Sequence, residues 1–137
     1  MNPPIMRTRS GEIVDLDAQR WWARCSRIDE KVLSSIVGPV LDVGCGPGRL
    51  VELLTRRGIE AMGVDVAQGA VRSTRQRGGR ALQRSVFDPI PDPGRWRTAL
   101  LFDGNVGIGG DPQALLERIV ELLAPGGTVV VELDGPG

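Results

Sequence analysis

Three glycines alternate with other residues in the segment Gly44-Cys45-Gly46-Pro47-Gly48, which points more directly to chemistry than any other part of the chain. The apolar run 40–43, interrupted by Asp42, precedes this loop, and a helical pattern over 49–57 follows it. Glycines permit left-handed turns and let a ligand approach the backbone closely. A strand, a glycine loop and a helix in this order are typical of the crevice in which an open parallel α/β sheet binds a nucleotide.

The spacing of the glycines distinguishes between two kinds of nucleotide site. The dinucleotide fingerprint G-x-G-x-x-G would place its third glycine at position 49, where this chain has Arg49, a side chain too large for close helix–strand packing. The pattern Asp42-x-Gly44-x-Gly46-x-Gly48 instead resembles the first motif of class I S-adenosylmethionine-dependent methyltransferases. The resemblance covers about residues 38–133. It implies a Rossmann-like fold, S-adenosylmethionine as the cofactor, and methyl transfer as the activity.

Several acids lie where such a fold would place a cofactor. Asp65 ends the second expected strand, where an acid accepts hydrogen bonds from ribose hydroxyls, although an ordinary loop acid is the alternative. By the resemblance, Asp88 contacts the adenine amino group, but Asp before proline also starts turns. Asp42 is costly inside an apolar strand unless it is paired. By the resemblance, it helps to hold the cationic amino-acid end of the cofactor. The full expected cofactor-binding set is Asp42, Gly44, Cys45, Gly46, Gly48, Asp65, Val66, Phe87, Asp88, Asp103 and Gly104.

The acceptor side of the site is expected near the end of the fourth strand. By the resemblance, the backbone of Asp103 and Gly104 faces the methionine part of the cofactor, and side chains including Asn105 face the substrate; a purely structural turn is the alternative. The chemistry implied is an in-line displacement, in which the protein holds two reactants in line. If a base is needed, a carboxylate must serve, Asp103 first, because the chain has no histidine and no tyrosine.

Strand and helix patterns alternate along the chain and predict an α/β fold: a Rossmann-like doubly wound parallel sheet of about five strands flanked by helices. Strands are expected at about 40–43, 60–65, 80–87, 98–103 and 128–133, with helices over 49–57, 67–77 and 111–123. Three prolines and one glycine in residues 88–97 predict a loop where a crossover helix would usually lie. The segment 123–127 resembles the family's turn into the fifth strand.

The chain is expected to form one domain, over 38–137, preceded by a loose segment, 1–14, and a helix, 15–37. Trp21 lies on the apolar face of that helix. It either packs against the core or, as the resemblance implies, screens the substrate. The usual sixth and seventh strands have no counterpart, so the domain is interpreted as incomplete at the C-terminus. The fifth strand would then be an exposed edge, which a homodimer could cover.

Composition excludes several other classes of protein. The 137 residues carry 17 basic and 17 acidic side chains, so no polyanionic partner such as nucleic acid is expected. The arginines at 72, 75, 77, 80 and 84 are interpreted as a solvated helix face. No apolar segment is long enough to cross a membrane. The two cysteines are too far apart for a metal or redox pair, so neither a metal site nor a disulfide is expected, and the protein is predicted to be cytoplasmic.

Three functions remain compatible with the sequence. The first is methyl transfer from S-adenosylmethionine to an unidentified, small-molecule acceptor. The second is a truncated module that binds S-adenosylmethionine without turnover, and the absent strands favour it. The third is a nicotinamide-dependent oxidoreductase, against which Arg49 argues.

Overall fold

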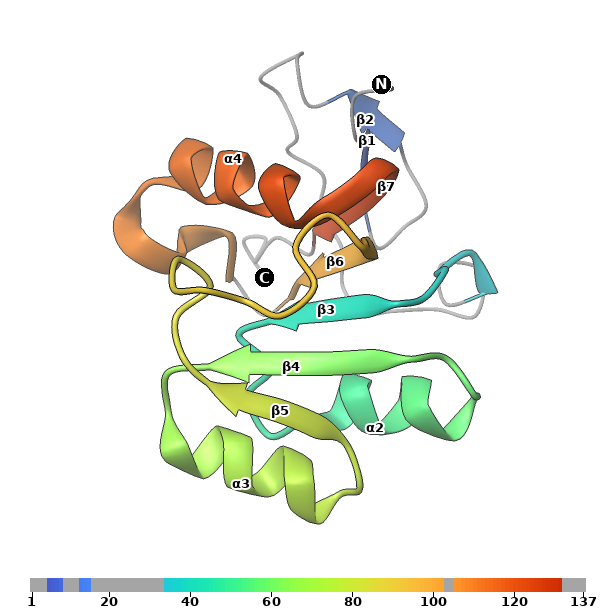
Figure 1. The fold of residues 1–137 in the computed structure, drawn as a ribbon, viewed down its shortest axis with the longest axis vertical. Coiled ribbons are helices and arrows are strands. Elements are labelled where there is room, and N and C mark those ends of the chain that lie inside the picture. The colour runs from blue at the N-terminus through green and yellow to red at the C-terminus, as the bar shows by residue number, and fades with distance from the viewer. Residues whose placement is uncertain (1–4, 9–12, 16–33, 103–104, 132–137) are drawn as a thin grey trace, which may run out of the picture.

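The computed structural model describes residues 5–8, 13–15, 34–102 and 105–131, of which 5–8, 13–15 and 105–107 are described as backbone only. These residues form one sheet flanked by helices (Figure 1). The strands are β1 (Ile5–Thr8), β2 (Ile13–Asp15), β3 (Val40–Val43), β4 (Ala61–Asp65), β5 (Arg80–Gln83), β6 (Trp96–Leu101) and β7 (Leu123–Val131). The helices are α2 (Arg49–Arg56), α3 (Gln68–Gln76), α4 (Pro112–Leu122) and the 3-10 segment η2 (Asn105–Gly110).

The five strands that the sequence predicts are all present and parallel, in the order β5-β4-β3-β6-β7. From β3, in the middle of the sheet, the chain moves outward through β4 to β5 and then returns to β6 on the other side of β3. This reversal between β3 and β6 is the switch point at which open α/β sheets bind ligands, outside the carboxyl ends of the strands. The predicted doubly wound fold is therefore confirmed.

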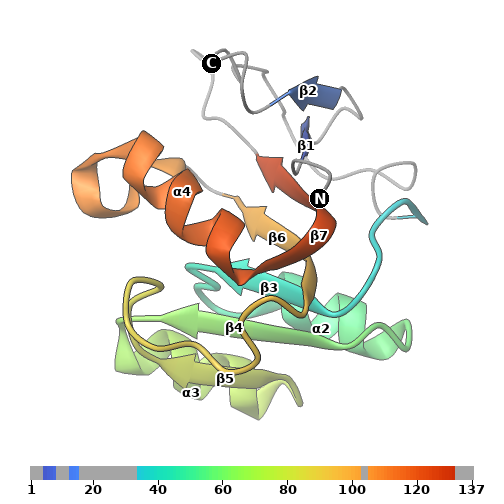
Figure 2. The ribbon, with the colours of Figure 1, turned by 45° about the horizontal axis from the view of Figure 1, so that its top comes forward.

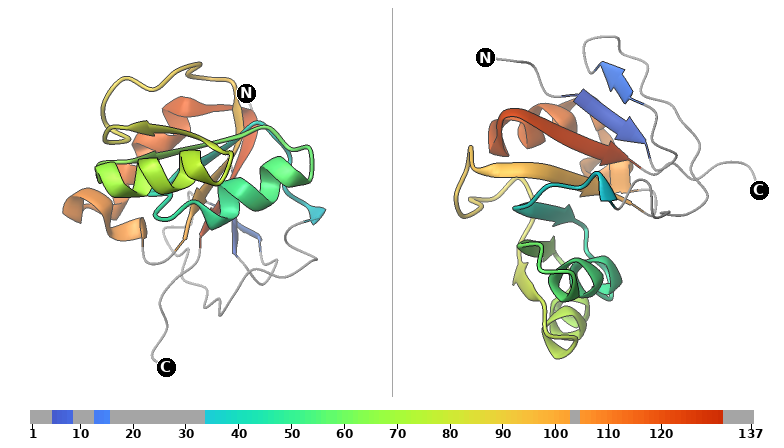
Figure 3. Two further views of the ribbon diagram at one scale, coloured as in Figure 1. Left: turned by 90° about the horizontal axis from the view of Figure 1, so that it is seen from below. Right: turned by 90° about the vertical axis from the view of Figure 1, so that its right-hand side faces the viewer.

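Helices cover both faces of the sheet because neighbouring residues of a strand point to opposite sides. Val40 belongs to a core cluster with Val51 and Leu54 of α2. The next residue, Leu41, belongs to a separate cluster with Leu115 and other residues of α4. In the left view of Figure 3, α2 and α3 accordingly lie in front of the sheet and α4 behind it.

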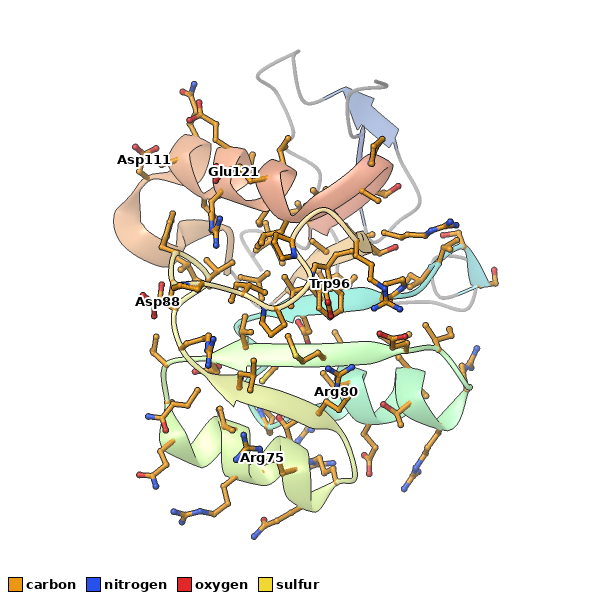
Figure 4. The ribbon with its side chains drawn as sticks, viewed as in Figure 1. Arg75, Arg80, Asp88, Trp96, Asp111 and Glu121 are labelled. Carbon is orange, nitrogen blue, oxygen red and sulfur yellow. The ribbon has the colours of Figure 1, made fainter. Side chains whose placement is uncertain are left out.

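The connection from β5 to β6 is a loop over residues 84–95, as the prolines predict. Its apolar side chains replace a helix as the cover of the sheet. Val86 and Ile90 are buried in the same cluster as α4, and so is Trp96, which has no exposed surface. The indole Nε1 of Trp96 donates to the carbonyl of Pro91 at 2.9 Å. Figure 4 shows Trp96 in the middle of the molecule. The early turn after Gln83 also explains why β5 is shorter than the predicted strand 80–87.

The N-terminal segment differs from the prediction. Residues 1–14 were expected to be loose, but they contain β1 and most of β2, which pair with each other antiparallel. Strand β1 also pairs in parallel with β7, Ile5 opposite Thr128 and Thr8 opposite Val131 (Figure 2). The prediction that β7 is an exposed edge is therefore wrong, and the homodimer loses the argument that supported it. Most of the predicted helix 15–37, with Trp21, lies outside the described residues.

We expect Trp96→Ala to lower the free energy of unfolding by about 3–5 kcal/mol, because it empties a fully buried site beneath the 84–95 loop. Trp96→Phe keeps most of the volume and loses the hydrogen bond to Pro91, so its cost should be smaller. Val120→Ala on α4 is the control, since Val120 is 38% exposed. Denaturant titration measures all three. Equal losses for Trp96→Ala and Val120→Ala would show that the loop is not part of the core.

Candidate functional site

The glycine loop leaves β3 at the carboxyl edge of the sheet in a conformation that favours glycine. Gly44, Gly46 and Gly48 have φ angles of +75°, +52° and +89°, in the left-handed region. The N–H groups of Gly44 and Cys45 both donate to the carbonyl of Val64 in β4, at 2.8 and 3.1 Å. The loop is thereby fixed across the ends of the two neighbouring strands.

Helix α3 packs directly against this loop, which the sequence did not predict. Ser73 Oγ donates to the carbonyl of Pro47 at 2.8 Å. A Cβ atom added to Gly48 would overlap Thr74 Oγ1 and lie 2.7 Å from Thr74 Cα. Thr74 is fully buried, and its hydroxyl donates to the carbonyl of Ala70 at 2.9 Å. The third glycine is therefore required by a neighbouring helix. No motif around Thr74 signals this contact, which depends on tertiary packing.

Cys45 fills a small space beneath the loop. Its Sγ lies 3.5 Å from Thr74 Oγ1, and a Cβ on Gly63 of β4 would lie 2.6 Å from that sulfur. Burial raises the pKa of the Cys45 thiol to about 11, so the side chain is neutral at physiological pH. A buried neutral thiol is suited to packing and is a poor nucleophile. The expected contact of Cys45 with a cofactor stays a prediction, and it would have to use the backbone.

Asp65, at the end of β4, contacts the glycine loop. One carboxylate oxygen, Oδ2, accepts the N–H of Gly46 at 3.0 Å. The other, Oδ1, accepts the N–H of Ala67 at 2.9 Å, before the first turn of α3. Each carboxylate oxygen has two lone pairs, so Asp65 can accept further hydrogen bonds from a ligand. The carboxylate is therefore held at the crevice by two backbone donors.

A pocket of about 180 Å³ opens beside this carboxylate, at the carboxyl ends of β3, β4 and β5. Its apolar walls include Val66, which is 69% exposed, and Ile108 of η2. Polar groups come from Asp65, Arg84 and Ser85. A pocket with apolar walls and a few polar groups is typical of a small-molecule site. The complete lining is Val43, Gly44, Val64, Asp65, Val66, Arg84, Ser85, Val86 and Ile108.

Phe87 and Asp88 lie next to the pocket but do not line it. They belong to a tight turn after β5, in which the Asp88 N–H donates to the Ser85 carbonyl at 3.0 Å. The Asp88 carboxylate accepts the Ser85 N–H at 2.9 Å. Figure 4 shows Asp88 on the side to which the arrows of β4 and β5 point. Phe87 contacts η2, since a Cβ on Gly109 would lie 3.0 Å from Phe87 Cε2. Their contacts with adenine stay predictions.

The other expected site residues are described in part or not at all. Asp42 is 3% exposed in β3, opposite Gly63 of β4 and Leu100 of β6. Asp103 and Gly104 lie outside the described residues, as does Trp21, and Asn105 is described only as backbone at the start of η2. No pattern in the sequence indicates that Ser73, Thr74, Arg84, Ser85 and Ile108 are neighbours of the site.

The described residues contain no group of three or more histidine, cysteine or acidic side chains that could hold a metal ion. Within the same part of the chain, no helix has the length and apolar character needed to cross a membrane.

Comparisons with known proteins agree with this geometry. A family model described as a methyltransferase domain matches residues 40–127. Trans-aconitate 2-methyltransferase of Paracidovorax citrulli (strain AAC00-1) is 30% identical over 107 residues, which are 75% of this chain and 41% of the relative. Protein-L-isoaspartate O-methyltransferase of Stenotrophomonas maltophilia (strain K279a) is 34% identical over 114 residues, 82% of this chain and 49% of that protein.

A solved structure gives the same result. The S-adenosylmethionine-dependent methyltransferase of Bacteroides fragilis, in complex with S-adenosyl-L-homocysteine, superimposes with a TM-score of 0.64 at 27% identity, over 72% of this chain and 43% of that one. The chain spans less than half the length of each of these three proteins. The glycine loop, the strand order and these matches lead to one assignment: the chain belongs to the class I S-adenosylmethionine-dependent methyltransferase domain family.

Proposed function

We propose that this chain binds S-adenosylmethionine in the pocket beside Asp65 and transfers its methyl group to a small-molecule acceptor. The observation that carries the proposal is the meeting of Gly46 and Asp65 at the carboxyl ends of β3 and β4, next to that pocket. The Bacteroides fragilis methyltransferase, solved with S-adenosyl-L-homocysteine bound, supports the choice of ligand.

The loop suits such a ligand because it is packed on one side and open at its centre. A Cβ on Gly48 would overlap Thr74, whereas a Cβ on Gly46 would have no atom within 4 Å. In the proposal, the open stretch at Gly46 accommodates the methionine part, and Asp65 accepts hydrogen bonds from the ribose hydroxyls. Val66 and Ile108 provide apolar contacts for the adenine ring. Ser85 and Asp88 lie at the edge of that ring.

When bound, S-adenosylmethionine supplies an electrophilic methyl group on a positively charged sulfur. The work of the chain is then to bind and orient, which lowers the barrier by fixing the geometry of two reactants in advance. The buried Asp42 lies beneath the loop, where its carboxylate suits a cationic ligand end. No described residue is proposed to take a proton.

We further propose that the acceptor atom is a carboxylate oxygen. The two relatives are named for trans-aconitate and for protein L-isoaspartate, and both of these acceptors carry carboxylates. Carboxyl groups have pKa values near 4, so at neutral pH the nucleophile has already lost its proton. A carboxylate acceptor therefore needs no general base, which agrees with the absence of histidine and tyrosine from the chain.

Calorimetric titration of the purified chain with S-adenosylhomocysteine, with NAD as the control, tests the cofactor assignment first. We expect micromolar binding of the first ligand alone, since the loop and Asp65 are already in place. Binding of NAD with similar affinity would favour the oxidoreductase, and failure of both ligands to bind a folded protein would contradict the site.

A methyl-transfer assay with trans-aconitate and an isoaspartyl peptide at saturating cofactor separates the enzyme from a binding module. With a carboxylate acceptor, the rate should not change by more than about twofold between pH 6 and pH 9. Tight binding without turnover of any carboxylate would favour the binding module.

Gly46→Ala and Gly58→Ala form a matched pair. Both glycines have positive φ angles, +52° and +78°, and in both cases the added Cβ has open space. We expect each substitution to lower the free energy of unfolding by about 1–2 kcal/mol, the cost of a left-handed alanine. Only Gly46→Ala should weaken binding of S-adenosylhomocysteine, by about tenfold or more. Equal affinities of the two variants would place the ligand elsewhere.

Asp65→Ala should weaken binding of S-adenosylhomocysteine by about 1.5–3 kcal/mol, because hydrogen bonds to a charged acceptor are lost. An analogue without the ribose 2′- and 3′-hydroxyls identifies the contact. The wild-type protein should prefer the natural ligand to the analogue, and Asp65→Ala should bind both alike. Glu117→Ala, an exposed acid on α4, controls for net charge. If Asp65→Ala keeps the preference for the natural ligand, Asp65 does not bind the ribose.

A further inference from the structure

The turn over residues 85–89 lies outside every helix and strand and contributes Ser85 and Val86 to the lining of the pocket. We propose that Arg84 and Arg118 are positioning residues that fix this turn and thereby let the site distinguish adenine from other bases. This inference rests on the proposed function, since it assumes that the pocket binds the adenosine part of S-adenosylmethionine.

The two arginines donate to three carbonyls of the turn. Arg118 of α4 donates from Nε to the carbonyl of Val86 and from Nη2 to that of Asp88, both at 2.9 Å. Arg84 donates from Nη1 to the carbonyl of Pro89 at 2.7 Å. A guanidinium is planar and always charged, so its donors are fixed relative to one another and form strong hydrogen bonds. One guanidinium therefore sets the spacing of two carbonyls in the turn.

The internal hydrogen bonds of the turn use three of its N–H groups and none of these three carbonyls. The Ser85 N–H donates to the Asp88 carboxylate, and the Phe87 N–H donates to Ser85 Oγ at 3.1 Å. The Asp88 N–H donates to the Ser85 carbonyl. The arginines satisfy the carbonyls of Val86, Asp88 and Pro89. Together the two sets of bonds define the position of Ser85 and Asp88 beside the pocket.

Arg118 also connects the turn to α4. Its Nη1 lies 3.5 Å from Oε1 of Glu121, one turn further along the helix, and its side chain is 21% exposed. Figure 4 shows Glu121 on α4 and Asp88 on the turn below that helix. Val86 is buried in the core cluster of α4, so the turn is fixed to this helix by packing as well as by hydrogen bonds.

Base discrimination depends on where polar groups of the turn lie. Adenine presents an amino group, which donates, where hypoxanthine presents a carbonyl, which accepts. An acceptor such as the Asp88 carboxylate favours the amino group of adenine and disfavours the carbonyl of hypoxanthine. Two acceptors cannot form a hydrogen bond with each other, and a polar group left without a partner lowers the binding affinity. Such discrimination is sensitive to small displacements, so loss of the arginine contacts should reduce it.

The test compares the dissociation constants of S-inosylhomocysteine and S-adenosylhomocysteine. In the wild-type protein we expect the inosine analogue to bind at least about tenfold more weakly. Arg118→Met, which keeps the apolar stem, should lower this ratio about fivefold or more, and Arg118→Lys should restore part of it. Arg84→Met should also lower the ratio, and it serves as the second variant if Arg118→Met does not fold. Arg72→Met, an exposed arginine on α3, is the control and should leave the ratio unchanged.

Two outcomes would overturn the inference. The first is an unchanged ratio in both arginine-to-methionine variants, whether their affinities stay the same or fall equally for both ligands. The second is a wild-type protein that binds both ligands alike. In each case S-adenosylhomocysteine still binds to the wild-type protein, so the proposed function survives. A wild-type protein that binds neither ligand would contradict the proposed function itself.

Discussion

The hydrogen bond from the Gly46 N–H to the Asp65 carboxylate joins the two central features of this structure. It connects the loop after β3 to the end of β4 at the carboxyl edge of the sheet, beside the point between β3 and β6 at which the strand order reverses. Because Asp65 also accepts the Ala67 N–H, the same carboxylate fixes the chain just before α3. Helix α3 in turn packs on the loop through Thr74, so the loop, the Asp65 carboxylate and α3 each contact the other two. The glycines are therefore needed twice, for the backbone conformation and for the approach of α3.

The opposite side of the pocket is built by different means. There the chain has no crossover helix after β5, and the side chains of Val86, Ile90 and Trp96 cover the sheet in its place. A loop without regular structure has few internal hydrogen bonds to keep its shape. Arg84 and Arg118 provide external ones, through the carbonyls of Val86, Asp88 and Pro89. One wall of the pocket thus depends on glycine geometry and the other on arginine side chains.

Local sequence signals predicted the parts of the fold that depend on local structure. The helix expected over 111–123 is present as α4, and the Asp111 side chain caps it by accepting the Ala114 N–H at 3.1 Å. The five parallel strands and a loop in place of a helix between β5 and β6 were also predicted, although the loop begins four residues earlier than the predicted 88–97, because glycine and proline restrict the backbone wherever they occur. Contacts between distant segments were missed. Nothing near Ile5 indicates pairing with Thr128, and nothing near Thr74 indicates contact with Gly48.

The arginines at 72, 75, 77, 80 and 84 were interpreted from the sequence as a solvated helix face, but several of them have partners in the folded chain. Arg77 pairs with Glu52, and Arg80 lies 3.7 Å from Glu60. Arg75 donates from Nε and Nη2 to the carbonyl of Ala81 in β5, at 3.2 and 2.8 Å. The N–H of Arg84 bonds to β4, and the backbone groups of successive residues in a parallel strand point alternately to its two sides. The backbone groups of Ala81, three residues earlier, therefore point away from β4. Arg75 therefore occupies a carbonyl on the outer side of β5, one edge of the described sheet. An occupied carbonyl disfavours pairing of β5 with another chain. On the other side of the sheet, β7 is covered by β1, and β2 is the edge strand.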